Sequence, residues 1–298
     1  MKSISIHLIL ILVACLGVNA QKPILVTEDS LSFGKNVMPA VSVIIPEANY
    51  EKALKAWKKD LESGTKSKLV TENSEMSIFG ARLKEINPDP VNVYSKMMNL
   101  DSIAKLTVAI ELKKDLYVGR SAGEEGLTKF KNYVREFAKN QYIDVVKDQV
   151  DAEEKKLRDI QKELSSLEKD KTNLQKVIQS NNTDIVTEKG NIEVQNNEVA
   201  RLSAEIVDQN KQLSSLEAGD AQNLKKDQIK DLEKMKKKAL NSIESSQNKI
   251  DKANNEIDKA NLEIPKNDRM QQDVMVKIER QQIVCQQFAD KLKTIKAY

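Results

Sequence analysis

The second half of the chain carries an apolar residue at almost every seventh position. Ten positions at this spacing run from Val150 to Leu213, and nine of them are apolar, with Lys171 as the exception. A second series runs from Ile229 to Ile264. Such a repeat, with a second apolar set three places further on, keeps one side of an α-helix facing a partner helix. The pattern therefore predicts a long coiled coil.

The coiled coil is predicted to fold back on itself as an antiparallel α-helical hairpin. The best break in the helical pattern is Ala218–Asp220, and a turn there places the two arms symmetrically about Gly219. In this register branched residues meet small ones, for example Ile185 opposite Ala253, which is the volume matching found in packed interiors. Pairing of two chains as a parallel dimer is the alternative.

Two features predict weak points in the hairpin. Lys171 lies opposite Asn267, beside Pro265, so we expect a polar joint there and a kink near 265. The segment 180–183, Ser-Asn-Asn-Thr, has low helix propensity and is expected to fray. Continuity of the hairpin through 180–190 stays open at this level.

Composition divides the chain into two parts. All but two of the aromatic residues lie between Phe33 and Tyr142. A packed core uses aromatic side chains and turn residues, whereas a long exposed helix has little use for either. We therefore predict a small α+β domain over 37–126 and the coiled-coil hairpin over 127–298. The first turns of the long helix are expected to pack on the domain, and residues 21–36 are interpreted as an N-terminal tether.

Local patterns within the small domain predict an antiparallel sheet with one helix. Helical spacing of apolar residues indicates a helix over 50–61, for which Asn49 is a suitable N-cap. Residues 41–45 are typical of a strand, and the alternation over 106–112 predicts a strand with one solvated face. Further strands are predicted over 68–72, 76–86 and 91–100. The topology of the sheet stays open.

The chain opens with a short basic segment and an apolar run over 4–18, followed by Ala20. This is typical of a secretory signal peptide over 1–20 and predicts export to the periplasm or the extracellular space. An alternative is that Leu12–Cys15 resembles the lipobox of bacterial lipoproteins. Cys15 would then be lipidated and would anchor the protein to a membrane.

Residues suited to catalysis are sparse. Cleavage of the signal peptide would remove His7, the only histidine, and with it any Ser-His-Asp site or His-ligated metal. Cys285 would remain as a single cysteine, so no disulfide could form within the chain. Glycine-rich phosphate loops and Gly-x-Ser-x-Gly elbows are absent. We predict a non-enzymatic protein with no catalytic residue, no cofactor and no metal site.

The hairpin tip is the candidate interaction site. Lysines outnumber acidic residues between Leu224 and Lys238, which predicts a positively charged end. Such an end suits anionic lipid, cell-wall polymer or an acidic protein; a merely solubilising role is the alternative. The small net charge of +3, with both signs interspersed, argues against nucleic acid. The lysines are Lys225, Lys226, Lys230, Lys234, Lys236, Lys237 and Lys238.

Together these patterns predict an exported structural or adaptor protein of the bacterial cell envelope, whose hairpin spans to a protein partner; a homo-oligomer stays open. Two alternatives remain. The layout of a small body with a coiled-coil hairpin is similar to periplasmic holdase chaperones of the Skp and prefoldin type, in which several hairpins enclose a client. A periplasmic adaptor of an efflux or secretion system would carry its hairpin within a β-rich domain, whereas here the hairpin comes last.

Overall fold

The computed structural model describes residues 24–72, 74–101 and 103–297. The predicted signal peptide, with His7 and Cys15, lies outside the described residues. The described chain forms two compact units. The first extends to Leu157 and includes the segment from Arg280 onward, and the second is Arg158–Glu279.

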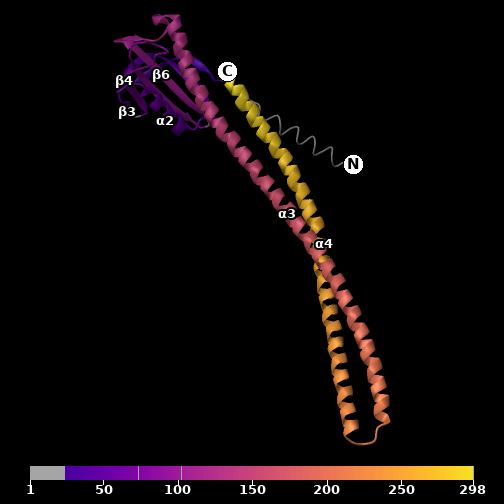
Figure 1. Ribbon diagram of the computed structural model, residues 1–298. Helices are drawn as coiled ribbons and strands as arrows, with labels where there is room; N and C mark the ends of the chain where they lie inside the picture. Colours follow the sequence, from indigo (N-terminus) through magenta and orange to yellow (C-terminus); the bar gives the residue numbers. More distant parts are fainter. Residues whose placement is uncertain (1–23, 73, 102, 298) are drawn as a thin grey trace, which may run out of the picture. The chain divides into compact units, whose positions relative to one another are not determined.

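The first unit is built on an antiparallel sheet of seven strands (Figure 1). Its strands are ordered β1-β2-β6-β5-β4-β3, and β7 pairs with β6. The predicted small α+β domain with an antiparallel sheet and a helix is therefore confirmed. The strands are β1 (Val26–Phe33), β2 (Asn36–Pro46), β3 (Val70–Glu72), β4 (Glu75–Ala81), β5 (Val91–Leu100), β6 (Ile103–Lys113) and β7 (Leu116–Tyr117). The helices are α2 (Tyr50–Leu61), the short 3-10 helix η1 (Arg120–Ala122), α3 (Glu124–Ser214) and α4 (Asp220–Lys296).

Two predicted elements have the observed bounds. Helix α2 covers 50–61, and the side-chain oxygen of Asn49 accepts a hydrogen bond from the Lys52 backbone N–H at 3.0 Å, as expected of an N-cap. Strand β5 covers 91–100. In both cases one face is buried and the other is wet, so periodicity alone locates the element.

The tether interpretation of 21–36 is wrong for residues 26–33, which form β1 and pair with β2 along their whole length. The acidic residues of β1 obscure the strand pattern in the sequence, because the side chains that pair with them lie on other elements. Asp29 accepts hydrogen bonds from the Ser42 hydroxyl at 2.6 Å and from Lys105 at 2.9 Å. Paired in this way, a carboxylate fits within a strand.

The predicted strand over 76–86 is too long. Strand β4 ends at Ala81, after an irregularity between Ile78 and Ala81 in its pairing with β5. Gly80 lies inside this irregularity with φ of 83°, which a residue with a side chain adopts only with strain. A turn follows, closed by the Asn87 N–H donating to the Leu83 carbonyl at 2.9 Å. The short strand β7 was not predicted.

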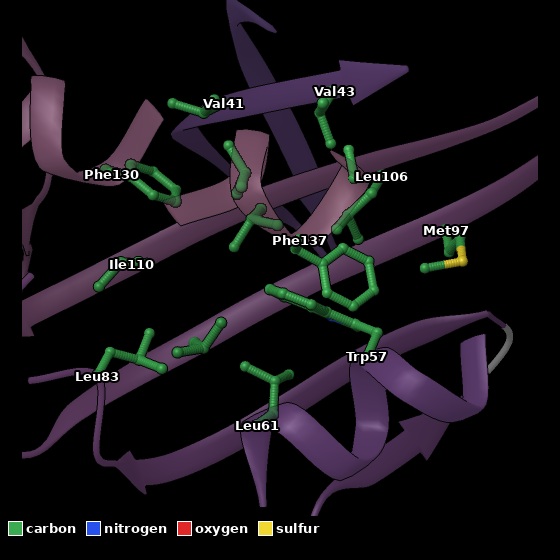
Figure 2. Packing of buried hydrophobic residues seen from close by; sticks show 14 of the residues in the cluster. Val41, Val43, Trp57, Leu61, Leu83, Met97, Leu106, Ile110, Phe130 and Phe137 are labelled. Atoms are coloured by element: carbon green, nitrogen blue, oxygen red, sulfur yellow. The ribbon is translucent and has the colours of Figure 1, made fainter. Parts of the chain in front are cut away.

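Helix α2 and the first turns of α3 cover one face of the sheet, as Figure 2 shows. Trp57 is fully buried there; its ring meets Phe137 edge to face at 4.9 Å, and its indole N–H donates to the Ser95 hydroxyl at 2.9 Å. Phe130 and Val134 of α3 are buried in the same core. The expected packing of the first turns of the long helix is therefore confirmed.

The opposite face of the sheet has a smaller core of its own. The tip of the β1–β2 hairpin folds over it, so that Phe33 stacks edge-on against Tyr94 with ring centroids 5.2 Å apart. The Gly34 N–H reaches the Glu75 carboxylate of β4 at 3.2 Å. Leu31 and Met38 are buried beneath this fold. The sheet is curled, so that the edge strand β1 covers part of the outer face of the same sheet.

In the second unit α3 and α4 run antiparallel and are joined by a turn at 215–219 (Figure 1). Ile185 of α3 is buried with Ile250 and Ala253 of α4. Across the same seam, the Glu188 carboxylate pairs with Lys249 at 2.8 Å. These contacts follow the register symmetric about Gly219, and the predicted antiparallel hairpin is confirmed.

Neither predicted weak point interrupts a helix. Helix α3 is continuous through 180–190, and α4 continues through Pro265; a kink near 265 stays a prediction. At the joint Lys171 forms an ion pair with Asp268 at 2.8 Å, and the buried Asn267 amide donates to the Leu167 carbonyl at 3.0 Å. Among the described residues, none of the helices is both long and apolar enough to cross a bilayer.

Candidate interaction surfaces

The turn at the hairpin tip is held by capping hydrogen bonds. At the end of α3 the hydroxyls of Ser214 and Ser215 donate to carbonyls of the last helical turn, at 2.7 and 2.8 Å. At the start of α4 the Gly219 carbonyl accepts from the N–H groups of Gln222 and Asn223 at 3.1 and 3.2 Å. Backbone groups that helix ends leave unpaired are therefore partly satisfied within the turn.

The seven predicted lysines divide into two groups. Lys225 and Lys236 are half-buried at seam positions, and Lys225 donates to Gln209 at 2.6 Å and to Gln212 at 2.8 Å, which joins the two arms. The other five are exposed. Four of them are spaced four, four and three residues apart, so they lie along one side of α4. We call these four the lysine stripe: Lys226, Lys230, Lys234 and Lys237.

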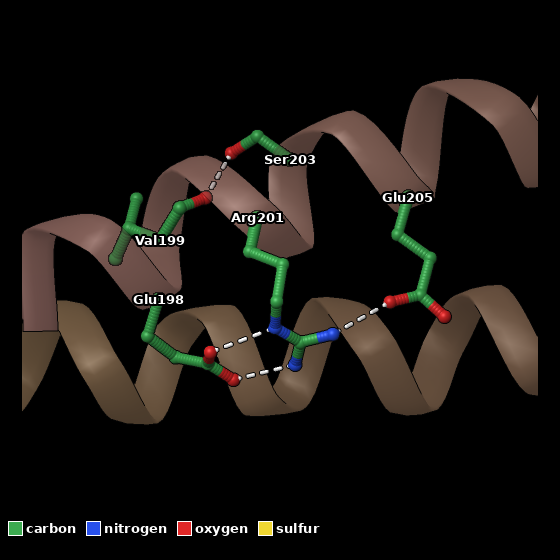
Figure 3. Close-up of polar contacts among 5 residues, drawn as sticks. All are labelled: Glu198, Val199, Arg201, Ser203 and Glu205. Atoms are coloured by element: carbon green, nitrogen blue, oxygen red, sulfur yellow. Dashed lines mark hydrogen bonds and ion pairs between the residues drawn. The ribbon is translucent and has the colours of Figure 1, made fainter.

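The facing arm near the tip adds no net positive charge. Arg201 of α3 lies between Glu198, at 2.7 Å, and Glu205, at 3.0 Å (Figure 3). The hydrogen bonds that Arg201 donates to Glu198 raise the pKa of Arg201 and lower the pKa of Glu198. One arginine against two glutamates leaves this segment of α3 with one negative charge, so the positive character of the tip comes from α4.

One polar layer interrupts the apolar seam of the second unit. Glu188 accepts hydrogen bonds from Lys249 and Asn191, at 2.8 and 3.2 Å. Hydrogen bonds from Lys249, Ser246 and Asn191 lower the pKa of Glu188 to about 2. A single polar layer of this kind disfavours shifted registers, because sliding would leave the carboxylate without its donors.

In the first unit a carboxylate ties both long helices to the sheet. Glu47, directly after β2, accepts from Lys291 of α4 at 2.7 Å and from Gln149 and Tyr142 of α3 at 3.1 and 3.3 Å. Lys291 also lies over the rings of Tyr142 and Phe288. Burial acts to raise the pKa of Glu47, but these hydrogen bonds outweigh it and lower the pKa. We call this group the Glu47 clamp.

A groove runs between α2 and α3 in the first unit. It consists of two cavities of about 310 and 290 Å³ that share Ala56 and Gln141. Lys52 and Asp148 form an ion pair of 2.6 Å between the two helices beside it. Five carboxylates and one lysine line the two cavities: Asp60, Glu85, Glu136, Asp144, Asp148 and Lys52.

Comparison with known proteins leaves the family open. No family model matches the chain, and no curated protein matches it. One similar solved structure is the Smc head domain with a coiled coil and joint derived from Pyrococcus yayanosii, at 13% identity and a TM-score of 0.21. The match covers 75% of this chain and 53% of that one, so the chain spans about half the length of that structure.

Sequence reasoning located the lysine-rich tip but missed the clamp and the groove. The residues of the clamp are separated by up to 244 positions. Those of the groove lie on α2, on α3 and on the segment after β4, and the sequence does not reveal how these parts pack together. The only local signal in the sequence was that Glu47 directly follows Pro46 at the end of a predicted strand. The structure adds that the φ of Glu47 is 53°, which is unusual for a residue with a side chain. Such a residue is a reason to look for distant partners.

Proposed function

We propose that this protein is an exported, non-enzymatic structural or adaptor protein of the bacterial cell envelope, in which the hairpin tip reaches a partner. The observation that carries the proposal is that α3 and α4 are each continuous and run antiparallel through the second unit. In the second unit alone, Arg158–Ser214 gives a coiled coil on the order of 85 Å long. A helical pair of this length serves to hold two surfaces apart.

The tip supplies the surface that such a spacer needs. Its turn is capped, its lysine stripe is exposed, and the opposing arm adds no net positive charge. A partner with an acidic face would gain charge complementarity and faster association there. The envelope location rests on the signal-peptide pattern of residues 1–20, and the bacterial origin on that pattern together with the lipobox-like Leu12–Cys15.

Site-specific photo-crosslinking in intact cells tests the proposal. A photoreactive residue at Asn223, exposed on the first turn of α4, is expected to capture a defined partner, which mass spectrometry identifies. The matched control is the same residue at Lys259, exposed on the side of the same helix. Equal capture at both positions, or capture only from the globular unit, would contradict the spanning role.

The holdase alternative predicts a different oligomeric state and a different activity. A clamp-like chaperone needs several hairpins around one client, and the purified protein should then suppress aggregation of an unfolded outer-membrane protein. Light scattering measures both the oligomeric state and the suppression. A monomer without suppressing activity eliminates this alternative and leaves the adaptor proposal intact.

A further inference from the structure

The groove between α2 and α3 is acidic at its edges and apolar at its floor. Ala53 is buried and Phe137 nearly so, while Ala56 and Val145 are half-buried, so small side chains leave room for another helix to approach. Five carboxylates face one lysine around it. All five carboxylates are exposed; Asp148 pairs with Lys52 and Asp60 accepts a hydrogen bond from Tyr133. The groove thus presents negative charge above a shallow apolar floor.

We propose that this groove binds the lysine stripe of a second copy of the same chain. The proposal deepens the proposed function, on which it rests, because it names one partner of the tip. Lys226, Lys230 and Lys237 are exposed along one side of α4, and their spacing would set them against carboxylates distributed along one side of α3. Glu136 and Asp144 are eight residues apart on α3, as Lys226 and Lys234 are on α4.

The contact would be strengthened by charge and limited by salt. Surface charges attract over roughly 10 Å at 0.1 M salt and much less at higher ionic strength. Because the tip and the groove are different surfaces, two copies can pair reciprocally as a dimer, or many copies can associate head to tail in rings or open chains. Self-association should therefore grow with protein concentration and weaken steeply with added salt.

Charge reversal of each surface tests the contact in the full-length protein. The tip variant is K226E/K230E/K237E, and the groove variant is E85K/E136K/D144K. In each variant alone, the tip and the groove carry charges of the same sign. Each is therefore expected to be monomeric, with self-association weakened about tenfold or more through the loss of charge complementarity. Mixed in equal amounts, the two variants are expected to associate again, because the acidic tip of one meets the basic groove of the other.

Sedimentation velocity at low and high salt measures these outcomes, and circular dichroism checks that each variant is folded. The variant K176E/K252E/K259E is the control, because it changes charge by the same amount at exposed positions away from the tip. Wild-type protein that stays monomeric at low salt overturns the proposal, and so does a mixture of variants that fails to associate.

Results of the two experiments can be told apart. Capture of an unrelated envelope protein from Asn223, with no self-association, supports the proposed function and overturns this inference.

Discussion

The two units of this protein bury apolar surface in different ways. In the first unit Trp57 is fully enclosed by side chains from α2, α3 and the sheet. In the second unit each helix buries one stripe against the other, and Ile192 and Ile257 stay partly exposed. A closed core removes a side chain from water on all sides, whereas a two-stranded seam does so on one. Stability should therefore be concentrated at few positions in the first unit and spread along the second.

The largest expected effect tests this contrast directly. Trp57→Ala leaves a cavity under the sheet and is expected to cost about 3–5 kcal/mol. Ile185→Ala, at the centre of the seam, is expected to cost about 2 kcal/mol, because the arms can close around a smaller side chain. Guanidinium unfolding followed by circular dichroism measures both. Equal losses would break the comparison between closed core and open seam.

The Glu47 clamp gives an intermediate effect in the first unit. Glu47→Gln keeps the shape but removes the charge that Lys291 pairs with, and it is expected to cost about 2 kcal/mol at neutral pH. Thermal unfolding across pH measures it, with Glu51→Gln, an exposed position on α2, as the control. A cost at Glu51 equal to that at Glu47 would contradict the clamp.

The pH dependence of the clamp has a definite sign. The pKa of Glu47 in the folded protein lies below its ordinary value of 4.5. Its contribution to stability is therefore complete above pH 4.5 and is lost as the pH falls through the lower folded-state pKa. The difference in stability between wild type and Glu47→Gln should shrink below pH 4.5. A difference that grows on acidification would contradict the assigned hydrogen bonds.

The smallest effects come from two glycines and should have opposite signs. Gly190 lies within α3 with open space around its Cα, so Gly190→Ala is expected to stabilise the second unit by about 0.5–1 kcal/mol. Gly34 also has open space, but its φ of 57° in the β1–β2 turn means that Gly34→Ala should cost about 1 kcal/mol. Thermal unfolding of the two variants compares them; effects of one sign would contradict this assignment.

Periodic patterns located the elements whose surroundings repeat along the chain. The seam of the hairpin, helix α2 and strand β5 each have one buried and one wet side, and the order of residue types records this. Strand β1 escaped because its acidic residues are paired with Ser42, Lys105 and Arg120, each from a distant part of the chain. The end of β4 was not predicted, because the strand ends at an irregularity in its pairing with β5 and not at a change in the hydrophobic pattern.

The candidate sites divide in the same way. The lysine-rich tip was visible because its residues follow one another within a single helix. The seven-residue spacing already put Lys236 at a seam position; the structure adds that Lys225 bonds Gln209 and Gln212 across the seam and that the stripe remains exposed. The acidic groove was invisible because its carboxylates come from α2, from α3 and from the segment after β4.

The sequence by itself determined that the second half of this protein consists of paired helices. It favoured a hairpin with its turn near Gly219 over a parallel dimer, and the structure shows the hairpin. In an antiparallel helical pair each layer brings together one seam residue from each helix. The seven-residue repeat and the position of the turn are therefore enough to define which residues pair. Only the tertiary structure decided the strand order, the curling of β1 over the outer face, the Glu47 clamp and the groove. Each of these features joins residues that lie far apart in the sequence with no regular spacing. No local repeat or charge pattern therefore indicates which residues come into contact.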